Sequence, residues 1–253
     1  MEPDLTIELI NATVQIEQLD GAGARTVGTG FLIDAPRPDG SPRTVLVTAA
    51  HLFERMPRDE ARIGWRFAGS DGTWRYSPGP LPIRIAGRPL WTRHPALDVA
   101  VMEVRAPQSF VRAAIPLAWL ADARSFETWG VGPGDEMMTV GYPLGQSSNR
   151  AGFPILCTGR VASYPLTPID QFPTFLLDIT VLNGNSGGPV FMAGYGRRRP
   201  GTEYPADGAF IAGVLTKQLE LEIGVVTHAV HVREAIALLD GPEPLLTTRP
   251  APD

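Results

Sequence analysis

Apolar and polar residues alternate with a period of two through much of this chain, in two sets separated by residues 106–131. Such alternation predicts strands with one buried face, whereas the proline- and tryptophan-containing separating segment predicts a surface connection. The first set of predicted strands covers residues 5–10, 13–17, 26–33, 44–48, 62–67, 81–85 and 99–104. The second set covers residues 136–140, 155–163, 174–180, 189–192, 210–217 and 223–227. The pattern therefore predicts an all-β protein.

The last part of the chain has a different period. Residues 229–239 carry apolar side chains at helical spacing, which predicts one amphipathic helix docked on the second set of strands. The apolar positions are Val232, Ala235, Ile236 and Leu239. A Gly-Pro pair then ends the helix, and we expect the Pro- and Thr-rich tail, residues 241–253, to be disordered.

Composition narrows the class of protein. The 253 residues include 27 glycines and 25 prolines, which suits short strands joined by turns better than a helical protein. A formal net charge of −5 argues against a nucleic-acid-binding surface, and the one basic run, residues 197–199, is interpreted as a solvated loop. No run approaches the ~18 apolar residues of a membrane-spanning helix. We therefore expect neither a nucleic-acid partner nor a membrane partner.

Two features bear on the cellular compartment. Cys157 is the only cysteine, so no internal disulfide can form, and its apolar neighbours indicate a buried residue rather than a nucleophile. The N-terminus lacks the basic start and apolar stretch of a signal peptide. If Met1 is the native start, we expect a cytoplasmic protein; if the chain was trimmed, we expect a secreted or periplasmic one.

Residues 184–191, Gly-Asn-Ser-Gly-Gly-Pro-Val-Phe, carry the clearest chemical signal. Glycines on both sides of Ser186 let the backbone approach a reacting carbonyl, because residues without a Cβ reach conformations that others avoid. The backbone N–H groups of Gly184 and Ser186 would then point at the place where an oxyanion forms. Ser186 is thus a candidate nucleophile that needs a base.

His51 is the candidate base. It ends an apolar, β-branched run, and the two alanines before it let the chain turn sharply so that the imidazole projects into a cleft. The alternative is a core histidine at a strand end. Asp98 is the candidate carboxylate, and it opens a predicted strand whose alternate residues face opposite sides. An Asp at such a place is also a common turn former.

Taken in the order His51, Asp98 and Ser186, these residues and their neighbours resemble the trypsin-like, chymotrypsin-fold serine peptidases, above all the bacterial HtrA-type and glutamyl-endopeptidase-type branches. The matching segments lie in order over residues 26–232. They are Gly28-Thr29-Gly30-Phe31-Leu32-Ile33, Thr48-Ala49-Ala50-His51, Leu97-Asp98-Val99-Ala100-Val101, Gly134-Asp135, Gly141-Tyr142-Pro143-Leu144-Gly145, and Gly184 to Phe191. No PDZ-like region follows them in this sequence.

The resemblance implies two antiparallel six-stranded β-barrels with the active site in the cleft between them, and a C-terminal α-helix. The N-terminal barrel, residues 1–115, would carry His51 and Asp98, and the C-terminal barrel, residues 116–240, would carry Ser186. By the same resemblance, Ser186 would attack the acyl carbon, His51 would take and return its proton, and Asp98 would orient His51. No metal and no other cofactor is implied.

Alignment to the serine suggests which residues contact the substrate. Thr180 and Val181 would form the base of the first specificity pocket, and a wall whose backbone pairs with an extended substrate would comprise Thr216, Lys217 and Gln218. This set predicts a small or medium apolar residue before the cleaved bond. The absence of an acidic side chain at the predicted base weighs against Arg or Lys.

Two alternatives for the pocket remain open at this point. An offset of two residues in the alignment would bring Asp178 into the pocket. His228 would favour acidic substrate residues if it faced the pocket, although Leu215 stands where glutamyl-specific relatives carry a His. The other interpretation of His228 is a buried histidine at a strand end.

Asn185 bears on activation. Animal relatives have Asp before the serine, which pairs with a freshly cut N-terminal Ile or Val and so builds the oxyanion hole. Because Asn185 occupies that position here, we do not expect a charge-paired activation step. Either the oxyanion hole is preformed, or a regulatory protein or a loop movement completes it.

Two other functions use the same residues. Residues 184–188 also satisfy the G-x-S-x-G elbow of α/β-hydrolase esterases, with Asp207 and His228 as partners, but the apolar run after Ser186 has no helical period. The other alternative is a catalytically silent binding module that has kept the trypsin-like fold. The sequence favours a serine endopeptidase acting on a protein or peptide in extended conformation. Dedicated processing in a bacterial signalling or defence pathway is the hypothesis for its context.

Overall fold

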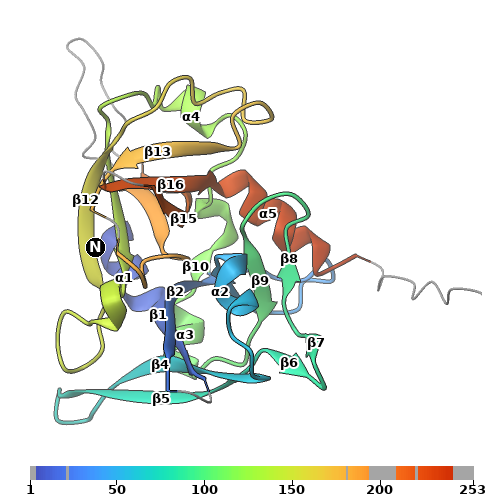
Figure 1. Ribbon diagram of the computed structural model, residues 1–253, viewed down its shortest axis with the longest axis vertical. Helices are drawn as coiled ribbons and strands as arrows, with labels where there is room; N and C mark the ends of the chain where they lie inside the picture. The colour runs from blue at the N-terminus through green and yellow to red at the C-terminus, as the bar shows by residue number, and fades with distance from the viewer. Residues whose placement is uncertain (1–3, 21–22, 181, 194–208, 220–221, 242–253) are drawn as a thin grey trace, which may run out of the picture.

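The first half of the chain folds into one sheet in the computed structural model, which describes residues 4–20, 23–180, 182–193, 209–219 and 222–241. The strand order is β5-β4-β1-β2-β3-β9-β8, with β10 paired in parallel to β2 (Figure 1). The strands are β1 (Thr13–Leu19), β2 (Arg25–Asp34), β3 (Thr44–Thr48), β4 (Glu60–Ala68), β5 (Trp74–Pro82), β8 (Thr92–Arg93), β9 (Ala100–Glu103) and β10 (Ile115–Pro116). A separate hairpin joins β6 (Arg84–Ile85) to β7 (Arg88–Pro89).

The second half closes into a six-stranded antiparallel barrel with the order β11-β12-β13-β16-β15-β14. Its strands are β11 (Glu136–Gly141), β12 (Ile155–Val161), β13 (Thr174–Asp178), β14 (Pro189–Ala193), β15 (Ala209–Leu219) and β16 (Ile223–His228). These six strands match the second predicted set to within a few residues at each end. The alternation of apolar residues therefore located the barrel correctly.

The two halves share one hydrophobic core. Phe31 and Val101 of the first sheet belong to the same buried cluster as Val214 of the barrel. Alternate residues of β9 face opposite sides, so Met102 belongs to a second cluster within the first sheet. Alternate residues of β9 therefore face opposite sides, as predicted, and both of these sides contact a buried cluster.

The first half differs from the closed six-stranded barrel that the resemblance implied. Its hydrogen-bonded sheet is open, with β5 at one end of the strand order and β8 at the other. Pro78, Pro80 and Pro82 occupy alternate positions of β5. Because proline has no N–H to donate to a ladder, a strand with three alternate prolines is suited to an edge and cannot form a complete second ladder.

The predicted strand over residues 5–10 is instead a helix, α1 (Leu5–Ala12). The side chain of Asp4 accepts a 2.9 Å hydrogen bond from the backbone N–H of Thr6, which caps the helix. Leu5, Leu9 and Ala12 are buried at spacings of four and three residues, so the helix buries one face. A short apolar run fits the period of a strand as well as that of a helix. The Asp4 cap and the packing of the buried face favour the helix.

The connection over residues 106–131 contains short helices of its own. They are α3 (Gln108–Ala113), the 3₁₀ helix η1 (Leu117–Trp119) and α4 (Ser125–Thr128). Phe110 and Phe126 are buried and anchor α3 and α4 to the body of the protein. The predicted boundary between residues 115 and 116 falls inside β10.

The predicted C-terminal helix is present as α5 (Ala229–Leu238). It packs on β15 and β16 of the barrel, as expected, and also on β8 and β9 of the first sheet, so it spans both halves (Figure 1). The predicted disordered tail lies outside the described residues, except for Gly241. No helix within the described ranges has both the length and the apolar composition that crossing a bilayer requires.

Candidate active site

His51 stands where the first sheet meets the barrel. Leu46 and Val47 of β3 are fully buried, and so are the two small residues that follow the strand, Ala49 and Ala50. The chain turns there into the short helix α2 (Ala50–Glu54), so His51 lies in a first helical turn rather than at a strand end. About a fifth of its side chain, 22 %, is exposed.

Asp98 lies in the loop between β8 and β9, two residues before the strand that it was expected to open. Its Oδ1 accepts a 2.9 Å hydrogen bond from the backbone N–H of His51, and its Oδ2 lies 2.6 Å from His51 Nδ1. Burial acts to raise the pKa of Asp98, but the hydrogen bonds from His51 outweigh burial and hold it below the usual value. An ionised Asp98 keeps the His51 proton on Nδ1, which leaves Nε2 free to accept one.

Ser186 lies in the tight turn between β13 and β14. Two of the three glycines around it have positive φ angles, +103° at Gly184 and +91° at Gly187. A Cβ on Gly187 would overlap the carbonyl oxygen of Thr29, and a Cβ on Gly184 would overlap that of Tyr142. Both positions therefore require glycine, for backbone conformation and for space.

Thr29 of β2 connects the Ser186 turn to the first sheet. Its backbone N–H donates to Ser186 O at 2.9 Å, and its hydroxyl donates to Gly184 O at 2.7 Å. The same hydroxyl accepts a 3.1 Å hydrogen bond from the backbone N–H of Tyr142. Sequence reasoning did not assign this role to Thr29, because a Gly-Thr-Gly strand carries no signal of a contact more than 150 residues away.

The backbone N–H groups of Gly184 and Ser186 donate to no group in the described part of the chain, whereas those of Asn185 and Gly187 already donate hydrogen bonds. The Asn185 N–H donates to Leu182 O at 3.0 Å, and the Gly187 N–H donates to Leu215 O at 2.7 Å. The turn thus leaves free the two donors that an oxyanion hole requires.

A cleft of about 340 Å³ contains the candidate residues. Its lining comprises His51, Arg55, Asp98, Leu182, Asn183, Ser186, Thr216, Lys217 and Gln218. All three candidate catalytic residues and the three predicted wall residues therefore border one space. No hydrogen bond joins the described side chains of Ser186 and His51, a contact that in unliganded hydrolases often tightens only when substrate binds.

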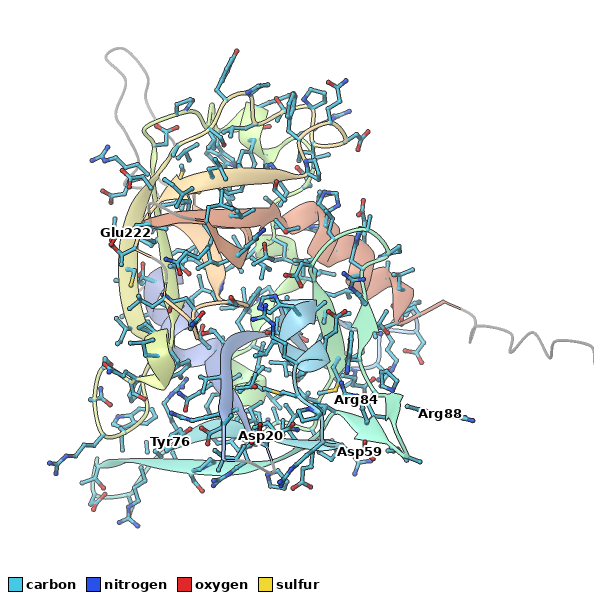
Figure 2. All side chains as sticks on the ribbon, viewed as in Figure 1. Asp20, Asp59, Tyr76, Arg84, Arg88 and Glu222 are labelled. Carbon is cyan, nitrogen blue, oxygen red and sulfur yellow. The ribbon has the colours of Figure 1, made fainter. Side chains whose placement is uncertain are left out.

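The predicted base of the specificity pocket is not part of this lining. Thr180 is exposed, and its hydroxyl lies 3.3 Å from Glu222 Oε2. Glu222 directly precedes β16 (Figure 2). Val181 lies outside the described residues. Asp178, which an alignment offset would have brought into the pocket, is an exposed residue of β13 and does not line the cleft.

Sequence reasoning missed three residues of the cleft: Arg55, Leu182 and Asn183. Arg55 follows His51 by one helical turn of α2, a spacing that would have placed it near the base had the helix been recognised. Together with Lys217 it brings positive charge to the cleft. Among the described residues that line the cleft, Asp98 is the only carboxylate, and it is hydrogen-bonded to His51.

His228 belongs to the core rather than to the cleft. It is 1 % exposed, and its ring packs against Phe126 and Phe175 with centroid distances of 4.5 and 4.9 Å. Burial, followed by the nearby His231, lowers the pKa of His228 to about 4. The interpretation as a buried strand-end histidine is therefore the right one, and His228 cannot select acidic substrate residues.

Comparison with known proteins shows the family and the fold of this chain. A model of the trypsin-like peptidase domain matches residues 28–197. Among solved structures, the active form of the Rv3671c protease from M. tuberculosis has 20 % identity and a TM-score of 0.52, covering 95 % of this chain and 86 % of its own. The inactive form of that protease has the same identity and TM-score, with coverages of 93 % and 92 %.

A thermostable serine protease, AL20, from an extremophilic microorganism is also similar, with 12 % identity and a TM-score of 0.51. The similarity covers 92 % of this chain and 98 % of that one. No curated protein sequence matches the chain significantly. At these identities the solved structures establish the fold.

Proposed function

Because this chain belongs to the trypsin-like peptidase family, we propose that it is a serine endopeptidase that works through Ser186, His51 and Asp98. The observation that carries the proposal is the paired contact between His51 and Asp98, at 2.6 and 2.9 Å, in the cleft that Ser186 also lines. A histidine oriented by a carboxylate next to a serine is the arrangement that activates a hydroxyl as a nucleophile.

The proposed reaction proceeds in two halves. Ser186 Oγ attacks the carbonyl carbon of the peptide bond while His51 Nε2 takes the hydroxyl proton, and the developing oxyanion accepts hydrogen bonds from the N–H groups of Gly184 and Ser186. His51 then gives the proton to the leaving amine, which yields an acyl-enzyme. A water molecule, deprotonated by His51, hydrolyses the acyl-enzyme and restores Ser186. Asp98 keeps His51 in the required tautomer throughout.

β15 supports binding of the substrate as an extended strand. Its pairing with β14 ends at Val214, and a register shift next to Thr216 interrupts its pairing with β16. The backbone from Thr216 to Gln218 therefore has an edge without a β14 neighbour, at the wall of the cleft. An extended peptide can add to such an edge through main-chain hydrogen bonds.

We propose a small or medium apolar residue before the cleaved bond. Leu182 lines the cleft, and the positive charge of Arg55 and Lys217 disfavours a basic side chain there. Cleavage of a library of peptides that vary at this one position tests the preference. Efficient cleavage after Arg or Lys would contradict it.

The fold removes one alternative. The G-x-S-x-G elbow of an esterase requires a helix directly after the serine, whereas Ser186 is followed by the barrel strand β14. His228, its proposed base, is buried away from the cleft. The remaining alternative is a trypsin-like binding module without catalysis, and chemical labelling distinguishes it from an enzyme.

A fluorophosphonate probe, which reacts with activated serines, tests the proposal directly. We expect one label on the wild-type protein at Ser186, and no label on Ser186→Ala or His51→Ala, because the hydroxyl is inert without its base. Ser148→Ala, which removes an exposed serine outside the cleft, should label like the wild type. A wild-type protein that stays unlabelled, alone and with candidate regulatory proteins, would favour the silent module.

The proposed context is dedicated processing of one target in a bacterial signalling or defence pathway. Mass spectrometry of new protein N-termini, after expression of the wild type and of Ser186→Ala, tests it. One or a few new N-termini that depend on Ser186 would support dedicated processing. Many unrelated ones would indicate broad proteolysis instead.

A further inference from the structure

The loop that carries Asp98 is closed around the ring of His94. The backbone N–H of His94 donates to Val99 O at 2.9 Å. Its ring Nδ1 accepts hydrogen bonds from the backbone N–H groups of Ala96 at 3.2 Å and Leu97 at 3.1 Å. Asp98 is the next residue, so its position depends on where the His94 ring is held.

Glu234 of α5 holds that ring. Its Oε2 lies 2.9 Å from His94 Nε2 and 2.7 Å from Nδ1 of His231, which precedes it by three residues on the helix. Both histidine side chains are 10 % exposed, whereas that of Glu234 is 53 % exposed. One carboxylate oxygen therefore connects the C-terminal helix to the Asp98 loop.

The hydrogen bonds within the loop determine which ring nitrogen of His94 accepts and which donates. Because Nδ1 accepts from two backbone N–H groups, the proton of the neutral ring lies on Nε2, which donates it to Glu234. Burial acts to raise the pKa of Glu234, but the hydrogen bonds from His231 and His94 outweigh burial and hold it below the usual value. Glu234 therefore accepts both contacts as a carboxylate.

The same three groups resemble a metal site, since their ligating atoms lie within 4.8 Å of one another. A metal ion would need the lone pair of His94 Nε2, which would move the ring proton to Nδ1. Two backbone N–H groups already point at Nδ1. The arrangement therefore suits hydrogen bonding better than metal coordination.

We propose that Glu234 is a positioning residue of the active site. Through His94 it fixes the loop over residues 94–99, and with it the Asp98 carboxylate that orients His51. The expected effect on catalysis rests on the proposed function, whereas the effect on the contact between Asp98 and His51 does not. A displacement of about 1 Å at a catalytic group costs on the order of 100-fold in rate, so a small loosening of this loop is measurable.

Steady-state cleavage of a peptide substrate by Glu234→Ala is the first test. We expect kcat to fall by about 10- to 100-fold with KM nearly unchanged. The variant displaces Asp98 and His51, whereas the wall over residues 216–218 that binds the substrate is unchanged. Glu234→Gln should retain most of the activity, since its amide oxygen can accept the same two N–H donors. Glu103→Ala is the matched control: that side chain is 52 % exposed and pairs with Arg37 at 2.6 Å, on the strand that follows the Asp98 loop. We expect it to stay within about twofold of the wild type, as an exposed pair contributes little.

Proton NMR supplies a measurement that does not depend on activity. The short hydrogen bond from His51 Nδ1 to Asp98 should give a strongly deshielded proton signal in the wild type, in Glu234→Gln and in Glu103→Ala. In Glu234→Ala that signal should broaden or move upfield. If the wild type shows the signal but cleaves nothing, the proposed function fails while this inference is still tested.

Three results would overturn the inference. One is a folded Glu234→Ala protein with the wild-type signal and the wild-type kcat. Another is a raised melting temperature on adding Zn²⁺ to the wild type but not to Glu234→Ala, which would make the cluster a metal site. If Glu234→Ala does not fold, Glu234→Asp is used in its place. The aspartate side chain is one methylene shorter, so its carboxylate cannot reach the rings of both His94 and His231. An unchanged signal and kcat in a folded Glu234→Asp would count equally against the inference.

Discussion

His51 and His228, for each of which the sequence left two interpretations open, lie in different environments. His51 has a carboxylate 2.6 Å from its Nδ1 and borders the cleft. His228 packs against Phe126 and Phe175, and neither of its ring nitrogens makes a hydrogen bond of regular geometry with a described residue, although the backbone of Leu166 lies beside the ring. A histidine with a paired carboxylate is suited to proton transfer, whereas a histidine surrounded by phenyl rings stays neutral.

His228 should make the protein less stable in mild acid. In the unfolded chain this histidine takes up a proton near pH 6.5, but in the folded protein it stays neutral until the pH nears its lowered pKa of about 4. Above about pH 6.5, the titration of His228 therefore does not change the free energy of unfolding. Between about pH 6.5 and 4 the free energy of unfolding falls, because only the unfolded chain binds the proton, and below about pH 4 it changes no further. This loss should reach about 3 kcal/mol, since each pH unit between the two pKa values is worth about 1.4 kcal/mol.

The variant His228→Leu tests this expectation by urea unfolding at several pH values. Leucine removes the titrating group and two unpaired polar atoms, so the variant should match or exceed the stability of the wild type at pH 7. Its advantage should grow as the pH falls from 6.5 to 4. Parallel stability curves for the two proteins would contradict the expectation.

At the scale of elements, β2 and the Ser186 turn depend on each other. The turn has no regular structure of its own, and its conformation is supported by Thr29 of β2 and Leu215 of β15. Because the hydrogen bonds to Thr29 cross from one half of the protein to the other, they couple the Ser186 turn to the first sheet.

Thr29→Val should weaken this connection. Valine has nearly the same shape but leaves the buried Gly184 O without its hydroxyl donor and the Tyr142 N–H without its acceptor. We expect a loss of about 1–3 kcal/mol in the free energy of unfolding, measured with urea, and slower fluorophosphonate labelling of Ser186. Thr26→Val, on the same strand and partly exposed, is the control and should change neither quantity appreciably. Labelling of Thr29→Val at the wild-type rate would show that the turn holds its conformation without the hydroxyl.

At the scale of the whole molecule, α5 and the residues that follow it contact both halves of the protein. Asp240, just after the helix, accepts two hydrogen bonds from Arg43 at 2.6 and 3.0 Å, and the Arg43 side chain is only 3 % exposed. The helix thus contacts the first sheet through Arg43 and through His94 while its apolar side packs on the barrel.

Asp240→Ala should destabilise the protein by about 3 kcal/mol, because it leaves the buried Arg43 charge without its carboxylate. The double variant Arg43→Met with Asp240→Leu should recover much of this loss, since neither residue then buries a charge. Urea unfolding measures both. Removing the exposed Arg37–Glu103 pair, with side chains 36 % and 52 % exposed, should cost no more than about 1 kcal/mol. An equal effect of the two pairs would show that burial of Arg43 is not the cause.

The sequence by itself determined the parts that depend on local pattern. Alternation located the six barrel strands, helical spacing located α5, and the glycines around Ser186 marked its turn. These signals are local because strand period, helix period and positive φ angles are properties of neighbouring residues. The sequence also proposed the three candidate catalytic residues, each through its own flanking segment, and their catalytic role stays a prediction.

Only the tertiary structure decided what depends on partners distant in the chain. Residues 5–10 fit a strand or a helix, and packing of Leu5 and Leu9 decided for α1. Most of β5 was not predicted, since the predicted strand over residues 81–85 overlaps it only at its end, and its three alternate prolines fit the open edge of the first sheet. The contact between His94 and Glu234 had no local signal, because it joins segments that meet only when the two halves pack around one core.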